Sequence, residues 1–189
     1  MKASVEDDGS ILKVKLEDAN EAVANALRRS MLTKVPTLSA SHIDIVKNES
    51  ALFDEMLAHR VGQVPFKIPQ NVDEGDTVHI AVNKEGPGNV VASDIKTDND
   101  EAEPTHPEAV IATLKENQAI EFEGEAELGK GEEHAKHQGG TVGYEITDDG
   151  EFLFRIESSS GYNNKELFNA AVEEVKDELD ELEEAVEDL

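Results

Sequence analysis

The chain has 189 residues, no cysteine and few aromatic residues (4%), and it carries a formal net charge of −26. The absence of cysteine excludes disulfides, thiolate metal sites and cysteine-ligated iron–sulfur clusters, so we expect no cofactor. The excess of 43 acidic over 17 basic residues argues against a surface that grips nucleic-acid phosphates. The first residues lack the apolar run of a signal peptide, and no apolar stretch is long enough to span a bilayer. We therefore expect a cytoplasmic protein.

The acidic residues occur along the whole chain among periodic apolar residues, so they do not form an acidic tail. A nucleic-acid mimic is one alternative explanation of this charge. We favour adaptation to a salt-rich cytosol, because at ~1 M ionic strength the Debye length falls to roughly 3 Å and self-repulsion is screened.

The first predicted elements are a strand and a helix. Residues 11–16 alternate between apolar and lysine side chains, which is typical of a half-buried strand. Asp18 followed by Glu21 predicts the N-cap and N3 positions of a helix, and Pro36 marks its end.

A second strand and helix follow. Residues 42–47 alternate again, and Ser50 predicts the cap of a helix that Gly62 and Pro65 terminate. The apolar face of that helix is predicted to contain Leu52, Phe53, Met56, Leu57 and Val61. The opening third of the chain therefore reads β-α-β-α.

Between residues 67 and 149 the pattern changes to short strands separated by polar, glycine- and proline-containing stretches. Residues 120–128 alternate apolar or small residues with glutamates without exception, so one face of their sheet must be solvated and negative. We predict an α+β fold of two domains. A mainly antiparallel β domain (67–149) is inserted into a discontinuous domain made of residues 1–66 and 150–189.

The last predicted elements are a strand over 152–156 and a long terminal helix. Asn163 and Glu166 are spaced as an N-cap and its N3 partner. A terminal helix of about 25 residues spans roughly 37 Å, which is longer than such a domain can cover. We therefore predict that the outer half of its apolar seam meets a helix of another polypeptide; packing wholly within its own domain is the alternative. The seam consists of Phe168, Val172, Val175, Leu179, Leu182, Val186 and Leu189.

Several blocks of the sequence resemble the D subunits of archaeal RNA polymerases. Their family includes the bacterial α amino-terminal domain and the eukaryotic third-largest polymerase subunits. The most specific block has the form DE-x-LAHR-x-G-x-x-P, and the blocks occur in family order. They lie at residues 25–32, 35–37, 48–50, 54–65, 128–136 and 154–158, with Gly161.

The resemblance implies a non-catalytic assembly subunit. The outer segments are expected to form a dimerisation domain that pairs with the polymerase L subunit. The inserted domain is expected to contact the N and P subunits and the second-largest subunit. The resulting platform would recruit the large catalytic subunits, which hold magnesium and perform nucleotidyl transfer, without direct DNA binding by this chain. An α-like homodimeric subunit, an acidic free-standing oligomeric interaction protein and a hydrolase built on the histidines and acids are alternatives.

The chain departs from the family pattern in two places. Many archaeal members carry an additional cysteine-rich, ferredoxin-like domain; this chain has no cysteine and too few residues for it, so we expect no cluster. The second block usually continues with a tryptophan and a proline, whereas His137, Gln138 and Gly139 stand here.

Arg28 and Arg29 are two of only four arginines. Because guanidinium groups pair bidentately with carboxylates, we expect both to contact the second-largest subunit. An intramolecular ion pair and phosphate binding are the alternatives.

Asp54, Glu55, His59 and Arg60 share one predicted helix. A carboxylate beside a histidine suggests acid–base chemistry, but no nucleophile lies nearby in the sequence. We expect local and intersubunit hydrogen bonding instead.

Lys130, His134 and Lys136 lie in a predicted flexible turn, where we expect them to meet other subunits. Gly129 to Gly131 lacks the full spacing of a phosphate-binding loop. His134 and His137 without a nearby third ligand make a weak zinc site.

Overall fold

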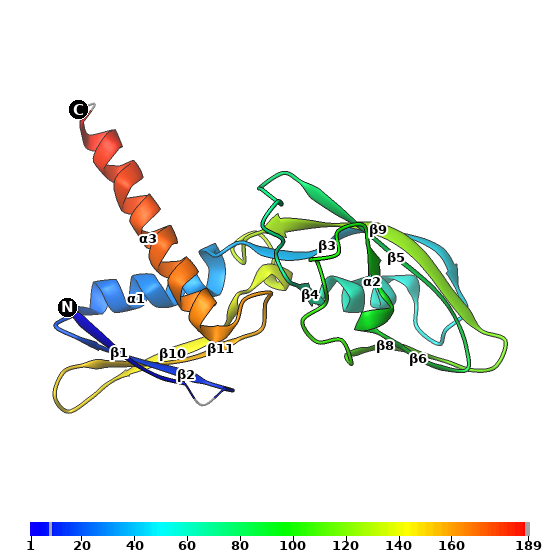
Figure 1. The fold of residues 1–189 in the computed structure, drawn as a ribbon, viewed down its shortest axis with the longest axis horizontal. Helices are drawn as coiled ribbons and strands as arrows, with labels where there is room; N and C mark the ends of the chain where they lie inside the picture. The colour runs from blue at the N-terminus through cyan, green and yellow to red at the C-terminus, as the bar shows by residue number, and fades with distance from the viewer. Residues whose placement is uncertain (8, 188–189) are drawn as a thin grey trace. The chain divides into compact units, whose positions relative to one another are not determined.

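The computed structural model describes residues 1–7 and 9–187, and the chain forms two compact units (Figure 1). Unit 1 combines Met1–Pro36 with Lys130–Leu189, and unit 2 consists of Thr37–Gly129. No helix within the described residues has both the length and the apolar character that crossing a membrane requires.

Unit 1 contains a four-stranded antiparallel sheet in the order β1-β2-β11-β10. The strands predicted at 11–16 and 152–156 are confirmed as β2 and β11, and every second residue of β2 from Leu12 is buried. β1 was not predicted because its sequence, KASVED, lacks alternation; its residues are all exposed, and it forms by pairing with β2. The bounds are β1 Lys2–Asp7, β2 Leu12–Glu17, β10 Gly140–Ile146 and β11 Phe152–Ser158.

The first helix of unit 1 is α1 (Glu21–Arg29), which continues as the π-helical turn η1 (Ser30–Lys34). The predicted cap at Asp18 is wrong. Asn20 caps α1 instead, with its Oδ1 accepting a hydrogen bond from the Val23 amide at 3.0 Å. Asp18 has a positive φ of 55° and belongs to the turn before the helix, so it is not in position to cap.

One apolar core holds unit 1 together. Leu27, Met31 and Leu167 from the helices meet Phe154 of the sheet, and all are buried. Because the helical and strand residues share one cluster, α1, η1 and α3 (Asn164–Glu187) cover a single face of the sheet (Figure 1). Unit 1 also contains the short 3-10 helix η3 (Ala135–His137).

Unit 2 is built around a five-stranded antiparallel sheet in the order β4-β3-β9-β5-β7, with a separate two-stranded sheet of β6 and β8. It also contains the helix α2 (Asp54–Gly62) and the 3-10 helix η2 (Ala92–Asp94). The strands are β3 Thr37–Asn48, β4 Pro65–Phe66, β5 Thr77–Glu85, β6 Gly88–Val91, β7 Lys96–Thr97, β8 Val110–Leu114 and β9 Ala119–Gly129.

The division between the units lies elsewhere than the predicted boundaries at 66/67 and 149/150. β3 has 12 residues and pairs with β9 from Thr37 opposite Gly129 to Asn48 opposite Ile120. This long pairing brings residues 37–66 into unit 2, together with α2. At the other boundary, β10 pairs with β11 and so belongs to unit 1.

The predicted cap of α2 at Ser50 is wrong. The helix begins at Asp54 with Phe53 in the N-cap position and no side-chain cap. The Ser50 hydroxyl instead accepts a hydrogen bond from the Leu52 amide at 3.1 Å, and Asn48 Oδ1 accepts from the Ser50 amide at 3.1 Å. These bonds stabilise a turn that precedes the helix.

The predicted apolar face of α2 is partly wrong. Leu57 and Val61 are fully buried in the core of unit 2. Phe53 and Met56, in contrast, are 76% and 48% exposed. The early turns of α2 therefore leave two large apolar side chains on the surface of the unit.

The alternation over residues 120–128 is confirmed in β9. Ile120, Phe122 and Ala126 are buried, whereas Glu123 and Glu127 are exposed. The glutamates therefore line the solvated face of the five-stranded sheet.

Asp94 of η2 accepts hydrogen bonds from Lys84 and from the Val91 amide. Burial raises the pKa of Asp94, but the Lys84 hydrogen bond, the Val91 amide and the charges of Lys84 and Lys96 outweigh it, so the pKa lies below its ordinary value. The stabilisation is therefore complete above pH 3.8 and is lost as the pH falls through the lowered pKa.

We expect Asp94→Asn to lower the free energy of unfolding by about 1 kcal/mol at neutral pH, because it weakens a charge-assisted pair. Thermal unfolding should show this difference shrinking in acid below pH 3.8. Asp100→Asn, which removes one charge at an exposed position, serves as the control. A difference that persists unchanged in acid would contradict the ionic origin of the stabilisation.

Candidate partner-binding surface

The helix α3 begins with the predicted capping box. Asn163 Oδ1 accepts hydrogen bonds from the amides of Lys165 at 3.0 Å and Glu166 at 2.9 Å. Glu166 returns a bond by accepting from the Asn163 amide at 2.8 Å. Three backbone amides at the helix start thus have side-chain partners, and this local prediction is confirmed.

The first half of α3 is held by unit 1. Leu167 and Ala171 are fully buried, while Phe168, Val172 and Val175 are partly buried against the same core. The predicted seam did not include Leu167 and Ala171. Leu167 and Ala171 are four positions apart and directly precede the seam residues Phe168 and Val172, and this spacing could have indicated a wider buried face.

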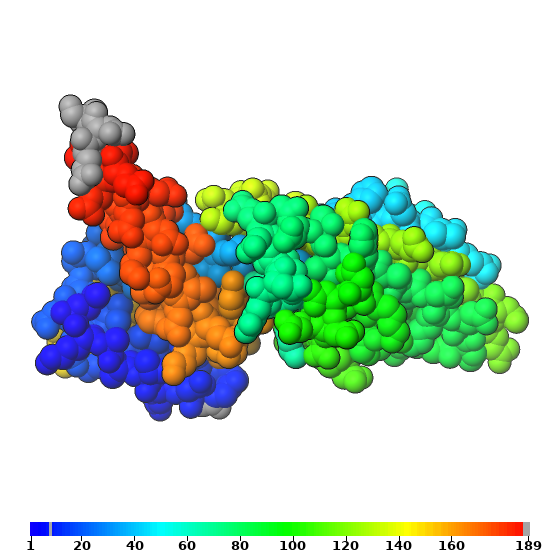
Figure 2. Space-filling model, turned by 45° about the horizontal axis from the view of Figure 1, so that its top comes forward, coloured from blue at the N-terminus to red at the C-terminus, as the bar shows by residue number. Residues whose placement is uncertain are grey.

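The second half of α3 carries apolar side chains that unit 1 does not cover. Leu179 and Leu182 are each 59% exposed and Val186 is 57% exposed. We call these three residues the outer stripe; Leu189, the last seam position, lies outside the described residues. Both views show this end of α3, in red, projecting beyond the sheet and α1 of its unit (Figures 1 and 2).

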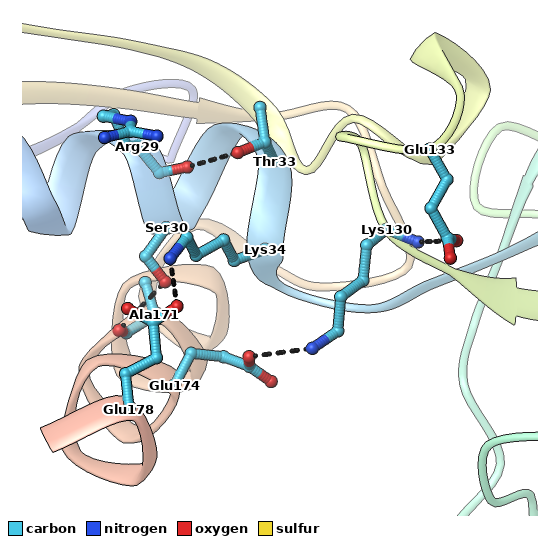
Figure 3. Close-up of polar contacts among 9 residues, drawn as sticks. All are labelled: Arg29, Ser30, Thr33, Lys34, Lys130, Glu133, Ala171, Glu174 and Glu178. Atoms are coloured by element: carbon cyan, nitrogen blue, oxygen red, sulfur yellow. Dashed lines mark hydrogen bonds and ion pairs between the residues drawn. The ribbon is translucent and has the colours of Figure 1, made fainter. Parts of the chain in front are cut away.

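Three polar contacts fix the middle of α3 (Figure 3). The buried Ser30 hydroxyl of η1 donates to the carbonyl of Ala171 at 3.2 Å. Lys34 of η1 pairs with Glu178 of α3. These contacts lie at the last turns before the outer stripe, so they determine where α3 leaves its unit.

Lys130 makes the third contact. Its Nζ lies 3.2 Å from Glu174 Oε2, and its backbone amide donates to Glu133 at 3.1 Å (Figure 3). The predicted partner-binding residue Lys130 thus also anchors α3 within unit 1.

Acidic residues dominate the electrostatics around α3. Burial, followed by the charges of Glu174 and Glu166, raises the pKa of Tyr162 to about 12, so its hydroxyl stays protonated. The hydrogen bond and charge of Glu173 raise the pKa of the exposed Lys176.

Arg28 and Arg29 end α1 in unit 1. Arg28 is partly buried and donates from Nη2 to the Asn25 side-chain oxygen at 2.9 Å. Arg29 is exposed, and its carbonyl accepts a hydrogen bond from Thr33 (Figure 3). The contact of both arginines with another polypeptide stays a prediction.

The predicted site residues of α2 are all exposed in unit 2. Asp54 accepts a hydrogen bond from Asn48 at 2.8 Å. Arg60 donates to the Ile111 carbonyl at 2.9 Å, which ties the helix to β8.

His59 Nε2 lies 3.3 Å from the side-chain nitrogen of Gln63, so the partner of His59 is Gln63, one turn further along the chain, and not Glu55. Glu55 lies in the first turn of the helix. The hydrogen bonds of Arg60 and His59 stabilise the end of α2. Phe53 and Met56, for which the helical spacing predicted core positions, add exposed apolar surface.

The turn over residues 130–139 has its own internal structure in unit 1. His134 is exposed and accepts a hydrogen bond from the Lys136 amide at 3.1 Å. His137, in the stretch where the resemblance leads one to expect a tryptophan and a proline, is only 3% exposed. Among residues 1–7 and 9–187, no three histidine or acidic side chains are grouped so as to hold a metal ion.

Comparison with known proteins places these features in a family. Residues 29–152, which include all of unit 2, match the family described as the RNA polymerase Rpb3/RpoA insert domain. DNA-directed RNA polymerase subunit Rpo3 of Halobacterium salinarum is 31% identical, and the alignment covers 97% of this chain and 96% of that protein. The chain belongs to the archaeal RNA polymerase Rpo3 family, whose members are the polymerase D subunits.

Other members of the Rpo3 family align over different shares of their length. The Rpo3 subunit of Natronomonas pharaonis is 44% identical over 124 residues, which are 65% of this chain but only 50% of that protein. The Rpo3 subunit of Methanocaldococcus jannaschii is 34% identical over 83% of this chain and 81% of the relative. The chain thus spans about half the length of some relatives and nearly all of others.

Proposed function

We propose that this chain is a non-catalytic assembly subunit of archaeal DNA-directed RNA polymerase in the cytoplasm. It pairs with the polymerase L subunit through the outer stripe of α3, and the pair recruits the large catalytic subunits. The chain itself uses no cofactor and contributes no catalytic residue.

The observation that carries this proposal is the exposure of the outer stripe in a member of the Rpo3 family. Leu179, Leu182 and Val186 stand on successive seam positions with more than half of each side chain in solvent. Burying the exposed part of each contributes about 1 kcal/mol or more. Such a stripe on a helix that is otherwise well anchored supports helix-to-helix association.

The remaining predicted residues are proposed to meet other polymerase subunits. We assign Arg28 and Arg29 to the second-largest subunit. The exposed residues of α2 and the turn with His134 and Lys136 are assigned to the N and P subunits and to the large subunits. The exposed Phe53 and Met56 add apolar area to the α2 surface.

Co-expression with an archaeal L subunit, followed by copurification at high salt, tests the proposal. We expect a stable one-to-one pair whose mass is the sum of both chains, measured by light scattering after gel filtration. At this high salt, where its charges are screened, the chain purified alone is expected to associate non-specifically through its exposed stripe.

The same experiment separates the alternatives. A well-behaved homodimer that excludes the L subunit would favour the α-like role. A defined higher oligomer that ignores the L subunit would favour a free-standing interaction protein. Either result would remove the proposed pairing.

A further inference from the structure

The outer stripe is surrounded by acidic side chains. Residues 177–186 contain no lysine or arginine. Glu178 and Glu183 lie directly beside the stripe, because each is four positions from one of its two leucines on the helix. The acids of this stretch are Asp177, Glu178, Asp180, Glu181, Glu183 and Glu184.

Two neighbouring bases, Lys176 and Lys34, are already engaged by acids of the same unit. Lys176 lies 2.9 Å from Glu173, and Lys34 pairs with Glu178. Glu183 lies further along α3, on the segment that projects from the unit. The border of the stripe is therefore most negative toward its outer end.

A second copy of this chain is a poor occupant of such a surface. Pairing two copies of α3 along their stripes would bring these acids against one another, and like charges beside a helical seam oppose association. At ~0.15 M ionic strength the Debye length is roughly 8 Å, so charges bordering one seam still repel each other, whereas at ~1 M they are largely screened. In a homodimer the apolar attraction between the stripes is therefore opposed by repulsion between their acids. With a partner of opposite charge, both interactions favour association.

We propose that the outer stripe accepts a helix of a different chain that carries lysine or arginine facing Glu183 and the acids near it. This inference rests on the proposed function and adds the charge of the partner to it. The apolar stripe supplies attraction, and the acidic border selects against a second copy.

Matched charge reversals test the proposal on the full chain. Glu183→Lys changes the border of the stripe, whereas Glu184→Lys makes the same charge change on the opposite side of α3. We expect Glu183→Lys to weaken binding to the L subunit about 10-fold at ~0.15 M KCl, because an exposed attraction becomes a repulsion. Glu184→Lys should leave the affinity near that of the parent chain, and the difference should shrink at ~1 M KCl.

Each outcome bears on a separate claim. If the L subunit binds the parent and Glu183→Lys equally well, or binds the variant more tightly, the charge rule is overturned and the assembly role remains. A parent chain that dimerises through α3 at ~0.15 M KCl overturns the exclusion of a second copy. Failure of the L subunit to bind the parent at all contradicts the proposed function itself.

Discussion

A chain carrying both Leu179→Gln and Leu182→Gln is expected to fold normally and to bind the L subunit at least ~100-fold more weakly than the parent chain. Each leucine is 59% exposed, so replacing it removes little of the core of unit 1. In the complex, each loses about 1 kcal/mol or more of apolar burial and leaves a buried amide that costs about 1–3 kcal/mol without a partner. Glutamine keeps the helix propensity high and adds no charge.

The matched control is Glu181→Gln with Glu184→Gln, which introduces the same side chain on the opposite face of α3. Isothermal titration with the L subunit and thermal unfolding of the isolated chain provide the two readouts. We expect both variants to melt as the parent does and only the stripe variant to lose affinity. Equal binding by all three chains would show that the outer stripe is not the contact.

Local features of the fold were predictable because few residues determine them. The capping box of Asn163 and Glu166 depends on side chains three positions apart, and the structure has it as predicted. The alternation over residues 120–128 likewise identified the buried and solvated faces of β9. In each case the sequence pattern and the final structure use the same short-range geometry.

The predicted boundary between the units was wrong because pairing between residues far apart in the sequence determines it. Nothing in residues 37–41 shows that β3 extends to Thr37, since its partner Gly129 is far along the chain. This pairing moved the first boundary between the units, and the pairing of β10 with β11 moved the second. The wrongly predicted caps at Asp18 and Ser50 have a different cause. Several polar residues precede each helix, and the turn conformation places Asn20 at the start of α1 but leaves α2 without a side-chain cap.

For the candidate surface, the sequence predicted the apolar seam of α3, but it did not predict which seam residues pack on unit 1 and which stay exposed. Leu167 and Ala171 are buried because the first half of α3 packs on the core of unit 1 with the face that carries these two residues, one position before the seam residues Phe168 and Val172. The two lysine–glutamate pairs of Lys34 and Lys130 join residues more than 40 positions apart, so no local pattern indicates them. They mark where the packed half of α3 ends and the exposed half begins.

Gly139→Ala is expected to destabilise unit 1 by about 1–3 kcal/mol, the range for forcing extra volume into a packed core. A Cβ added to Gly139 would lie 2.3 Å from the Met31 carbonyl oxygen and 2.9 Å from a methyl carbon of Leu167. One of these neighbours is backbone, so the turn itself must shift. Thermal unfolding should show a loss of several degrees.

Gly143→Ala, in the neighbouring strand β10, is the matched control, because an added Cβ there meets no atom within 4 Å. We expect its melting temperature to equal or exceed that of the parent chain. Since Gly139 contacts both η1 and the first turn of α3, its displacement should also loosen the base from which the outer stripe projects. Gly139→Ala should therefore weaken binding to the L subunit even below its melting temperature, whereas an unchanged affinity would show that α3 holds its position without this turn.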